Sequence, residues 1–86
     1  MKRYTLAPQF IRDFRALEPG MSPGDQQILD ALLAAVINDP QGVERVQSFY
    51  DPQRPSWLTR SDPFVVHFAF DADADEVIFL NLFRRR

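Results

Sequence analysis

The stretch PFVVHFAFDADADEVIFLNLF, residues 63–83, decides the fold, because it holds two apolar runs that flank a short acidic segment. Each run is rich in valine, isoleucine and phenylalanine and has the length of one strand, so the stretch predicts two strands. The segment DADAD, residues 71–75, is then the hairpin loop between them. Both runs are apolar on both faces, so the second face of the sheet needs its own reason to be apolar.

Two amphipathic helices are predicted before these strands. In PQFIRDFRAL, residues 8–17, the apolar side chains recur at helical spacing, and the following Pro19-Gly20 ends the helix. The second helix starts with Ser22 and Pro23 in a pattern like a capping box, in which an aspartate replaces the usual glutamate or glutamine. Its helical period continues until the segment NDP, residues 38–40. The short turn between the two helices predicts a helical hairpin.

The other segments complete the predicted sheet. KRYTLA, residues 2–7, predicts a first strand, and SWLTRS, residues 56–61, predicts another. Within residues 41–55 only RVQSFY, residues 45–50, has strand character. The order is therefore β-α-α-β-β-β, which predicts an α+β fold in which a helical hairpin packs on a mainly antiparallel sheet. We expect residues 1–86 to form a single domain with one core.

Composition limits the compartment and the kinds of partner. The chain has no cysteine, which fits a reducing cytoplasm, and it has no apolar signal region and no run of roughly 18 apolar residues. We therefore expect a soluble, cytoplasmic protein without membrane contact. The net charge is −2, so any nucleic-acid contact must be local. If the two terminal strands are neighbours, Lys2 and Arg3 share one basic corner with Arg84, Arg85 and Arg86.

The acidic segment does not predict a calcium site. Its alternating aspartates are similar to a calcium-binding loop, but Glu76 stands where the sharp turn needs glycine. Leu82 stands where a bidentate glutamate is needed. A solvated hairpin loop is the better interpretation, and we expect no metal and no cofactor.

His67 is the only histidine, which excludes a site with two histidine ligands. On an alternating strand it shares a face with Val65 and Ala69, and the opposite face is fully apolar. The simpler interpretation is a half-buried histidine that is hydrogen-bonded to a neighbour. The alternative is acid–base catalysis, since imidazole titrates near neutral pH.

Three stretches of the chain resemble the RelE/ParE superfamily of bacterial type II toxins. They are YTLAPQFIRDFRAL (residues 4–17), INDP (37–40), and WLTRSDPFVVHFAF (57–70) followed by VIFLNLFRRR (77–86). The resemblance implies a concave sheet face that carries an active groove, and a cognate antitoxin that wraps the toxin in a hetero-oligomer. The RelE-like branch cleaves mRNA on the ribosome with basic residues in place of metal ions, whereas the ParE-like branch poisons DNA gyrase.

The resemblance also implies roles for single residues. The terminal basic residue of the family's last strand matches Arg86, or Arg85 with a slip of one residue, and this residue would hold the scissile phosphate. His67 would act as the acid or base. Further contacts to nucleic acid are expected from Arg60, Arg84, Lys2 and Arg3.

Three departures from the family pattern leave the activity open. Val65 stands where the family has an arginine, and Ser56 and Leu58 stand where lysines are frequent. The sequence also ends where many RelE relatives continue to a catalytic tyrosine. We therefore keep three functions: an mRNA endoribonuclease that inhibits translation, a gyrase inhibitor without nuclease activity, and an inactive homologue that still binds antitoxin.

Overall fold

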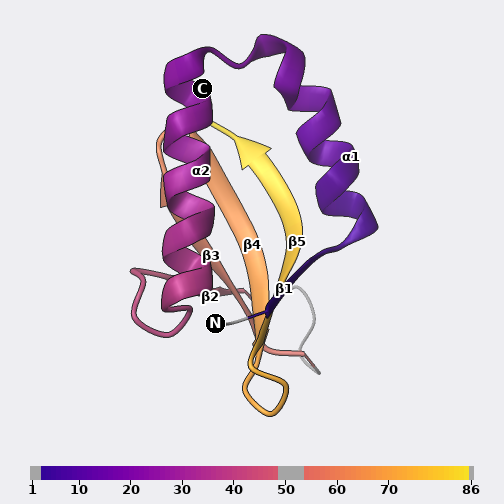
Figure 1. The fold of residues 1–86 in the computed structure, drawn as a ribbon, viewed down its shortest axis with the longest axis vertical. Helices are drawn as coiled ribbons and strands as arrows, with labels where there is room; N and C mark the ends of the chain where they lie inside the picture. The colour runs from indigo at the N-terminus through magenta and orange to yellow at the C-terminus, as the bar shows by residue number, and fades with distance from the viewer. Residues whose placement is uncertain (1–2, 49–53, 86) are drawn as a thin grey trace.

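The computed structural model describes residues 3–48 and 54–85, which form two helices packed on a five-stranded sheet (Figure 1). The elements are β1 (Arg3–Leu6), α1 (Pro8–Leu17), the 3-10 helix η1 (Glu18–Gly20), α2 (Pro23–Asn38), β2 (Val46–Ser48), β3 (Ser56–Ser61), β4 (Phe64–Asp71) and β5 (Glu76–Arg84). The predicted α+β class is confirmed. The structure adds β2, a short strand within the segment that the sequence left least defined.

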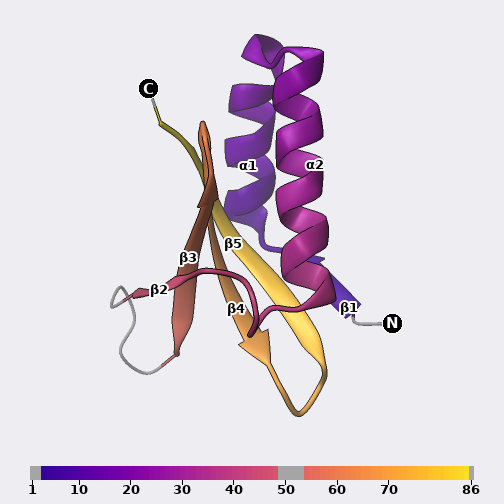
Figure 2. The same ribbon diagram turned by 90° about the vertical axis from the view of Figure 1, so that its left-hand side faces the viewer.

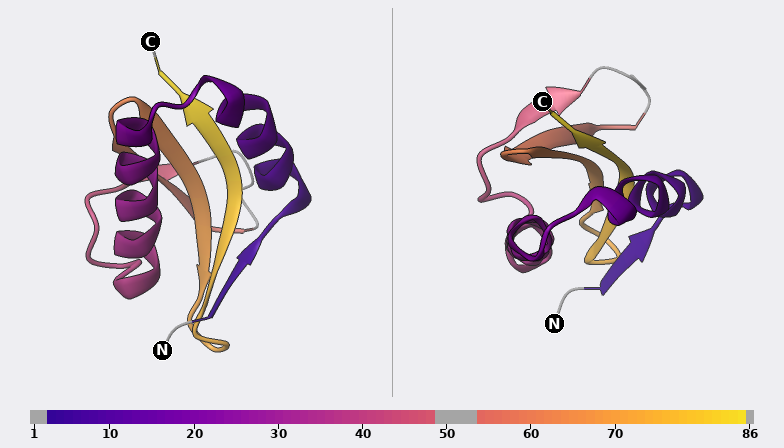
Figure 3. Two further views of the ribbon diagram at one scale, coloured as in Figure 1. Left: turned by 45° about the horizontal axis from the view of Figure 1, so that its top comes forward. Right: turned by 90° about the horizontal axis from the view of Figure 1, so that it is seen from above.

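The strand order in the sheet is β1-β5-β4-β3-β2. Strands β2 to β5 pair in antiparallel fashion, and β1 alone pairs in parallel with β5. Both helices lie on the same face of the sheet (Figures 2 and 3). No helix among residues 3–48 and 54–85 covers the opposite face, and the site described below lies there.

The core lies between the helices and the sheet. Along β4, Phe64, Val66 and Phe68 alternate and are completely buried, as the strand period predicts. The core residues are Phe10, Leu29, Leu32, Val36, Phe64, Val66, Phe68, Val77, Phe79 and Leu82. None of the helices in the described part of the chain is long and apolar enough to cross a membrane.

The predicted capping box at the start of α2 is confirmed. The Ser22 hydroxyl accepts a hydrogen bond from the Asp25 amide at 3.0 Å, and Asp25 Oδ2 accepts one from the Ser22 amide at 3.2 Å. The Arg84 guanidinium also donates to Asp25 Oδ2 at 3.0 Å. The backbone hydrogen bond from Ser22 and the contact with Arg84 hold the pKa of Asp25 below its ordinary value. This one carboxylate therefore links the start of α2 to the end of β5.

A β-bulge in β5 changes which side chains face the helices. His67 pairs with Asn81 and Phe68 pairs with Phe79, so Leu80 is one extra residue between them. As a result Leu82 returns to the buried core, and Leu80 and Asn81 both line the opposite face. Strict alternation from Ile78 and Leu80 would place Leu82 on the groove face and Asn81 on the core face, and the bulge reverses both placements.

Helix α1 covers the edge of β5 beyond the end of β1. The Ala7 amide donates to the Phe79 carbonyl at 2.8 Å, and this hydrogen bond ends the pairing of the first strand with β5. Further along β5, the amide of Leu82 donates to the Asp13 carboxylate of α1 at 3.0 Å. Asp13 thus takes the place of a neighbouring strand and satisfies an amide at the sheet edge.

The loop between β4 and β5 is the tight turn that the DADAD segment predicts. Asp71 Oδ1 accepts hydrogen bonds from the amides of Asp73 and Ala74 at 3.0 and 3.2 Å. Asp75 has a positive φ of 50°, a conformation that aspartate adopts more readily than most residues. The predicted hairpin loop is confirmed.

Candidate active-site groove

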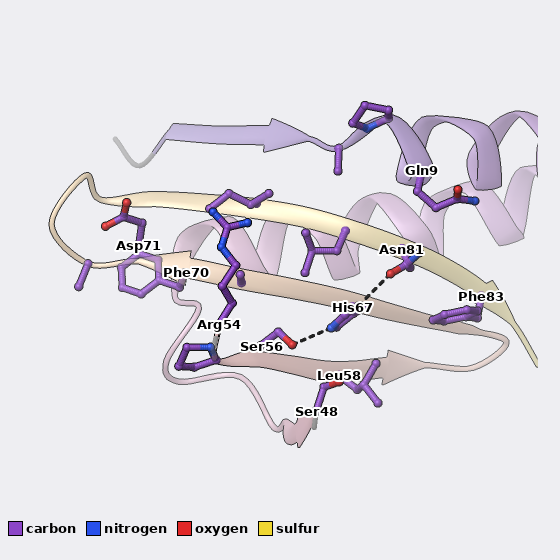
Figure 4. A pocket seen from close by; sticks show the side chains of 17 residues that line it. Gln9, Ser48, Arg54, Ser56, Leu58, His67, Phe70, Asp71, Asn81 and Phe83 are labelled. Carbon is purple, nitrogen blue, oxygen red and sulfur yellow. Dashed lines mark hydrogen bonds between the residues drawn. The ribbon is translucent and has the colours of Figure 1, made fainter. Parts of the chain in front are cut away.

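The face of the sheet opposite the helices holds an open groove of about 1170 Å³ (Figure 4). Strands β3, β4 and β5 form its floor, and the start of α1 contributes to one wall. Its lining is mainly apolar, with Leu58, Ile78, Leu80 and Phe83 among the contributing side chains. The strand sequences predict a second apolar face of the sheet, and this face lines the groove.

A chain of two hydrogen bonds crosses the floor of the groove. His67 Nε2 lies 2.7 Å from Ser56 Oγ, and His67 Nδ1 lies 2.9 Å from Asn81 Oδ1 (Figure 4). The three residues come from the adjacent strands β3, β4 and β5. An amide oxygen only accepts hydrogen bonds, so Nδ1 carries a proton, and in the neutral ring Nε2 then accepts the proton of the serine hydroxyl. This arrangement makes Nε2 the basic atom of the ring.

His67 is buried in the structure, whereas the sequence predicts a half-buried side chain. Its exposed fraction is 6%, and that of Ser56 is 3%. The predicted histidine hydrogen-bonded to its neighbours is confirmed, and so is its place on the face opposite Phe64 and Val66. Its role in acid–base chemistry stays a prediction.

The sequence did not predict Ser56, Asn81 or Arg54 as site residues, and it identified Ser56 only as a departure from the family pattern. Asn81 is the one polar residue within the apolar run at residues 77–83, and that exception was the available signal. Arg54 is the only arginine or lysine among the described residues that line the groove, and it extends over the groove from the side of Ser56 (Figure 4). It precedes Ser56 by two positions, which places both on one side of an extended chain.

Comparison with known proteins informs on the fold. No protein-family model and no curated protein matches the sequence. The structure is similar to a chain in the crystal structure of the archaeal RelE–RelB complex from Pyrococcus horikoshii OT3, with a TM-score of 0.69. The likeness covers 98% of this chain and 94% of that chain, at 13% sequence identity. The protein has a RelE-like fold. The resemblance predicted from sequence is thus confirmed at the level of the fold.

Arg84 and Arg85 of this RelE-like fold have different surroundings. The Arg84 guanidinium lies on the helix side, bonded to Asp25 at 3.0 Å and 5.7 Å from the centre of the Phe64 ring. Arg85 is exposed just beyond β5, where its amide donates to the Pro63 carbonyl at 2.6 Å. Arg84 therefore has a structural partner away from the groove, and its nucleic-acid contact stays a prediction.

Arg60 lies at the same end of the sheet as Arg85. It is exposed on β3 opposite Val65 of β4, and Val65 pairs with Phe83 of β5. Val65 is half-buried at the position where the RelE pattern has an arginine. The three paired residues Arg60, Val65 and Phe83 therefore include one cation fewer than that pattern would give. Arg86 and Lys2, two of the residues predicted to contact nucleic acid, lie outside the described residues.

Arg3 lies at the other end of the sheet. Because β1 is parallel to β5, Arg3 pairs with Glu76 at the start of β5, and its guanidinium donates to the Ala74 carbonyl at 3.0 Å. The start of β1 and the end of β5 therefore lie at opposite ends of the sheet (Figure 1). The expectation that Arg3 joins Arg85 in one basic corner was wrong, because neighbouring strands do not bring the chain ends together when they are parallel.

Proposed function

We propose that this protein is the toxin of a toxin–antitoxin pair and that its groove cleaves mRNA on the ribosome. The observation that carries the proposal is the RelE-like fold with an open groove centred on His67, whose Nε2 is held as a hydrogen-bond acceptor. In the reaction, a 2′-hydroxyl of the RNA takes the place of the Ser56 hydroxyl at Nε2. The imidazole then accepts its proton as the 2′-oxygen bonds to the adjacent phosphorus. The bond from phosphorus to the 5′-oxygen of the next nucleotide breaks, that oxygen takes the proton from the imidazolium, and a 2′,3′-cyclic phosphate remains.

Three arginines, in two regions around the groove, supply positive charge for the phosphate. Arg54 lies on the wall of the groove, and Arg60 and Arg85 are exposed at its end near the close of β5. Guanidinium groups bind phosphate oxygens through paired hydrogen bonds and stabilise the charge that develops on them. We assign Arg85, with Arg86 beyond it, to the scissile phosphate and Arg60 to a flanking phosphate.

The proposed partner is an antitoxin segment that folds as it binds. Large apolar side chains are exposed at both sheet edges and beside the groove, with exposed fractions of 56% for Tyr4, 69% for Val46 and 48% for Phe83. A segment that becomes ordered on binding covers such a dispersed surface well. The similar chain was solved in a RelE–RelB complex, which supports a protein partner of this kind.

Three observations favour a second candidate, inhibition of DNA gyrase without catalysis. Both ring nitrogens of His67 are hydrogen-bonded within the protein, the residue is almost completely buried, and Val65 replaces the arginine of the RelE pattern. The same facts fit a homologue that binds antitoxin and has no catalytic activity. These alternatives differ from the first in what happens to RNA.

Expression of the protein in bacterial cells separates these functions. We expect induction to stop incorporation of labelled amino acids and to produce new 5′ ends within coding regions, with plasmid supercoiling unchanged. His67→Gln and the double variant Arg85→Ala/Arg86→Ala should abolish the cleavage. The charge-matched control Arg12→Ala/Arg15→Ala, on exposed positions of α1, should retain it.

Stability is measured on the same variants, because glutamine does not reproduce both hydrogen bonds of His67. Loss of supercoiling with intact mRNA would replace the proposal by gyrase inhibition. Normal growth with intact mRNA and normal supercoiling would leave only antitoxin binding.

A further inference from the structure

Ser56, His67 and Asn81 have the relative geometry of a nucleophile, its base and the group that orients the base. We propose that Ser56 is a nucleophile and that the groove transfers the acyl group of carboxylic esters. This activity goes beyond the proposed function and does not depend on it. The proposal rests on the same hydrogen-bond chain, but here the Ser56 hydroxyl keeps its hydrogen bond to Nε2 and is itself the reacting group.

The direction of the two hydrogen bonds supports this assignment. Asn81 Oδ1 holds the proton on Nδ1, so Nε2 is the atom that accepts from Ser56 Oγ at 2.7 Å. A serine hydroxyl is a weak nucleophile until an adjacent base takes its proton, and a third group fixes the base in the required tautomer. Here three neighbouring strands hold all three side chains, so the arrangement exists before any substrate binds.

The surroundings of Ser56 indicate the class of substrate. Leu58, Leu80 and Phe83 line the groove near the hydrogen-bond chain and suit an apolar acyl group. Arg54 extends over the groove from the side of Ser56 (Figure 4) and is the cation available to the oxygen that becomes negative. Low exposure of Ser56 and His67 keeps bulk water away from the reacting atoms.

The reaction balances with water as the second reactant. Ser56 Oγ bonds to the carbonyl carbon of the ester as its proton passes to His67 Nε2. The bond from that carbon to the alcohol oxygen breaks, and the leaving alcohol takes the proton from Nε2. Water then attacks the acyl-serine in the same way, which releases the carboxylic acid and restores the serine hydroxyl.

Covalent labelling of the purified chain tests the proposal directly. We expect an alkyl fluorophosphonate to form a single adduct that mass spectrometry places on Ser56, and p-nitrophenyl butyrate to be hydrolysed. His67→Gln should slow both reactions by roughly 100-fold or more, since general-base assistance contributes about 10²–10⁴-fold. Ser61→Ala, at an exposed serine of the same strand, is the matched control and should change neither reaction. Absence of the adduct on Ser56, or an equal rate in His67→Gln, would overturn the proposal.

The absence of cysteine from the chain permits a second test that needs no substrate. Ser56→Cys and Ser61→Cys each introduce a single thiol, buried in the first case and exposed in the second. Burial alone slows alkylation, whereas an adjacent imidazole accelerates it by forming the thiolate. We expect iodoacetamide to react faster with Ser56→Cys, and addition of His67→Gln to remove the advantage. A slower reaction at position 56, or one that does not depend on His67, would contradict the assignment.

Both tests use the purified chain without RNA or ribosomes. A failure to cleave mRNA therefore leaves the labelling result intact, and a failure to label leaves the toxin proposal intact.

Discussion

The two faces of the sheet use the same strands in different ways. On the face that the helices cover, Phe64, Val66 and Phe68 are completely buried and make an apolar core. On the groove face, His67 of the same strand is also buried, but its polar atoms are bonded to Ser56 and Asn81. The first face gains stability from the transfer of apolar area out of water. The second carries buried polar groups, which would cost stability if they were unpaired, and the hydrogen bonds of His67 to Ser56 and Asn81 offset that cost.

The largest expected effect comes from the helix-covered face. Phe68→Ala removes a completely buried ring and should lower the free energy of unfolding by about 3–5 kcal/mol. Leu58→Ala, at a half-buried position of the groove, is the comparison variant and should cost much less, since its side chain already contacts solvent. Urea unfolding followed by circular dichroism measures both. Equal losses would show that the two faces do not differ in their contribution to stability.

The next effect tests the polar network of the groove. Asn81→Leu keeps the branching of the side chain at Cγ but removes the acceptor of His67 Nδ1, which should cost about 1–3 kcal/mol for an unpaired buried donor. Asn81→Asp restores an acceptor oxygen at the same position and should recover part of the loss. Thermal unfolding compares the two variants, and a leucine variant as stable as the parent would mean that the bond to His67 does not contribute.

Loss of the cap at the start of α2 should have a smaller effect, again on the helix side. Ser22→Ala removes the hydroxyl that accepts from the Asp25 amide and should cost about 1 kcal/mol. Ser61→Ala, at an exposed serine without a cap, is the control and should be near neutral. Differential scanning calorimetry measures the difference, and equal melting temperatures for the two variants would argue against the cap.

Acid should act through the same cap. The pKa of Asp25 is lower in the folded protein than its ordinary value of 3.8, so its contribution to stability is present above pH 3.8. It is lost as the pH falls through the lowered folded pKa. Asp25→Asn should therefore lose stability at neutral pH and show a weaker acid dependence. Melting temperatures at a series of pH values test this prediction. If Asp25→Asn loses stability in acid as steeply as the parent, Asp25 is not the source of that acid dependence.

The smallest effect on stability is expected at the exposed end of β5. Arg85→Ala should change the free energy of unfolding by no more than about 0.5 kcal/mol, as is usual at exposed positions. If Arg85 contacts a phosphate, the same variant should lower the salt dependence of RNA binding by about one unit of slope. Arg84→Ala should instead weaken the fold, because it loses the bond to Asp25. Fluorescence anisotropy at several salt concentrations measures the RNA binding, and urea unfolding measures the stability of both variants.

Local patterns in the sequence predicted most of the elements correctly. The strands on either side of DADAD, the two helices and the capping box at Ser22 all depend on contacts within a few residues, so periodicity and capping chemistry indicate them. The placement of His67 on the face opposite Phe64 follows from the period of a strand. The overall resemblance to the RelE/ParE pattern followed from the same elements in order.

Contacts between distant residues produced the features that the sequence did not predict. The parallel pairing of β1 with β5 joins Arg3 to residues more than 70 positions away, and no local pattern distinguishes parallel from antiparallel neighbours. The bulge at Leu80 likewise depends on the partner strand, and it brings Leu80 and Asn81 to the groove together. Ser56, His67 and Asn81 meet only because three strands pair in one register. A sequence shows which side chains can form hydrogen bonds, but pairing across the sheet determines which of them come within reach.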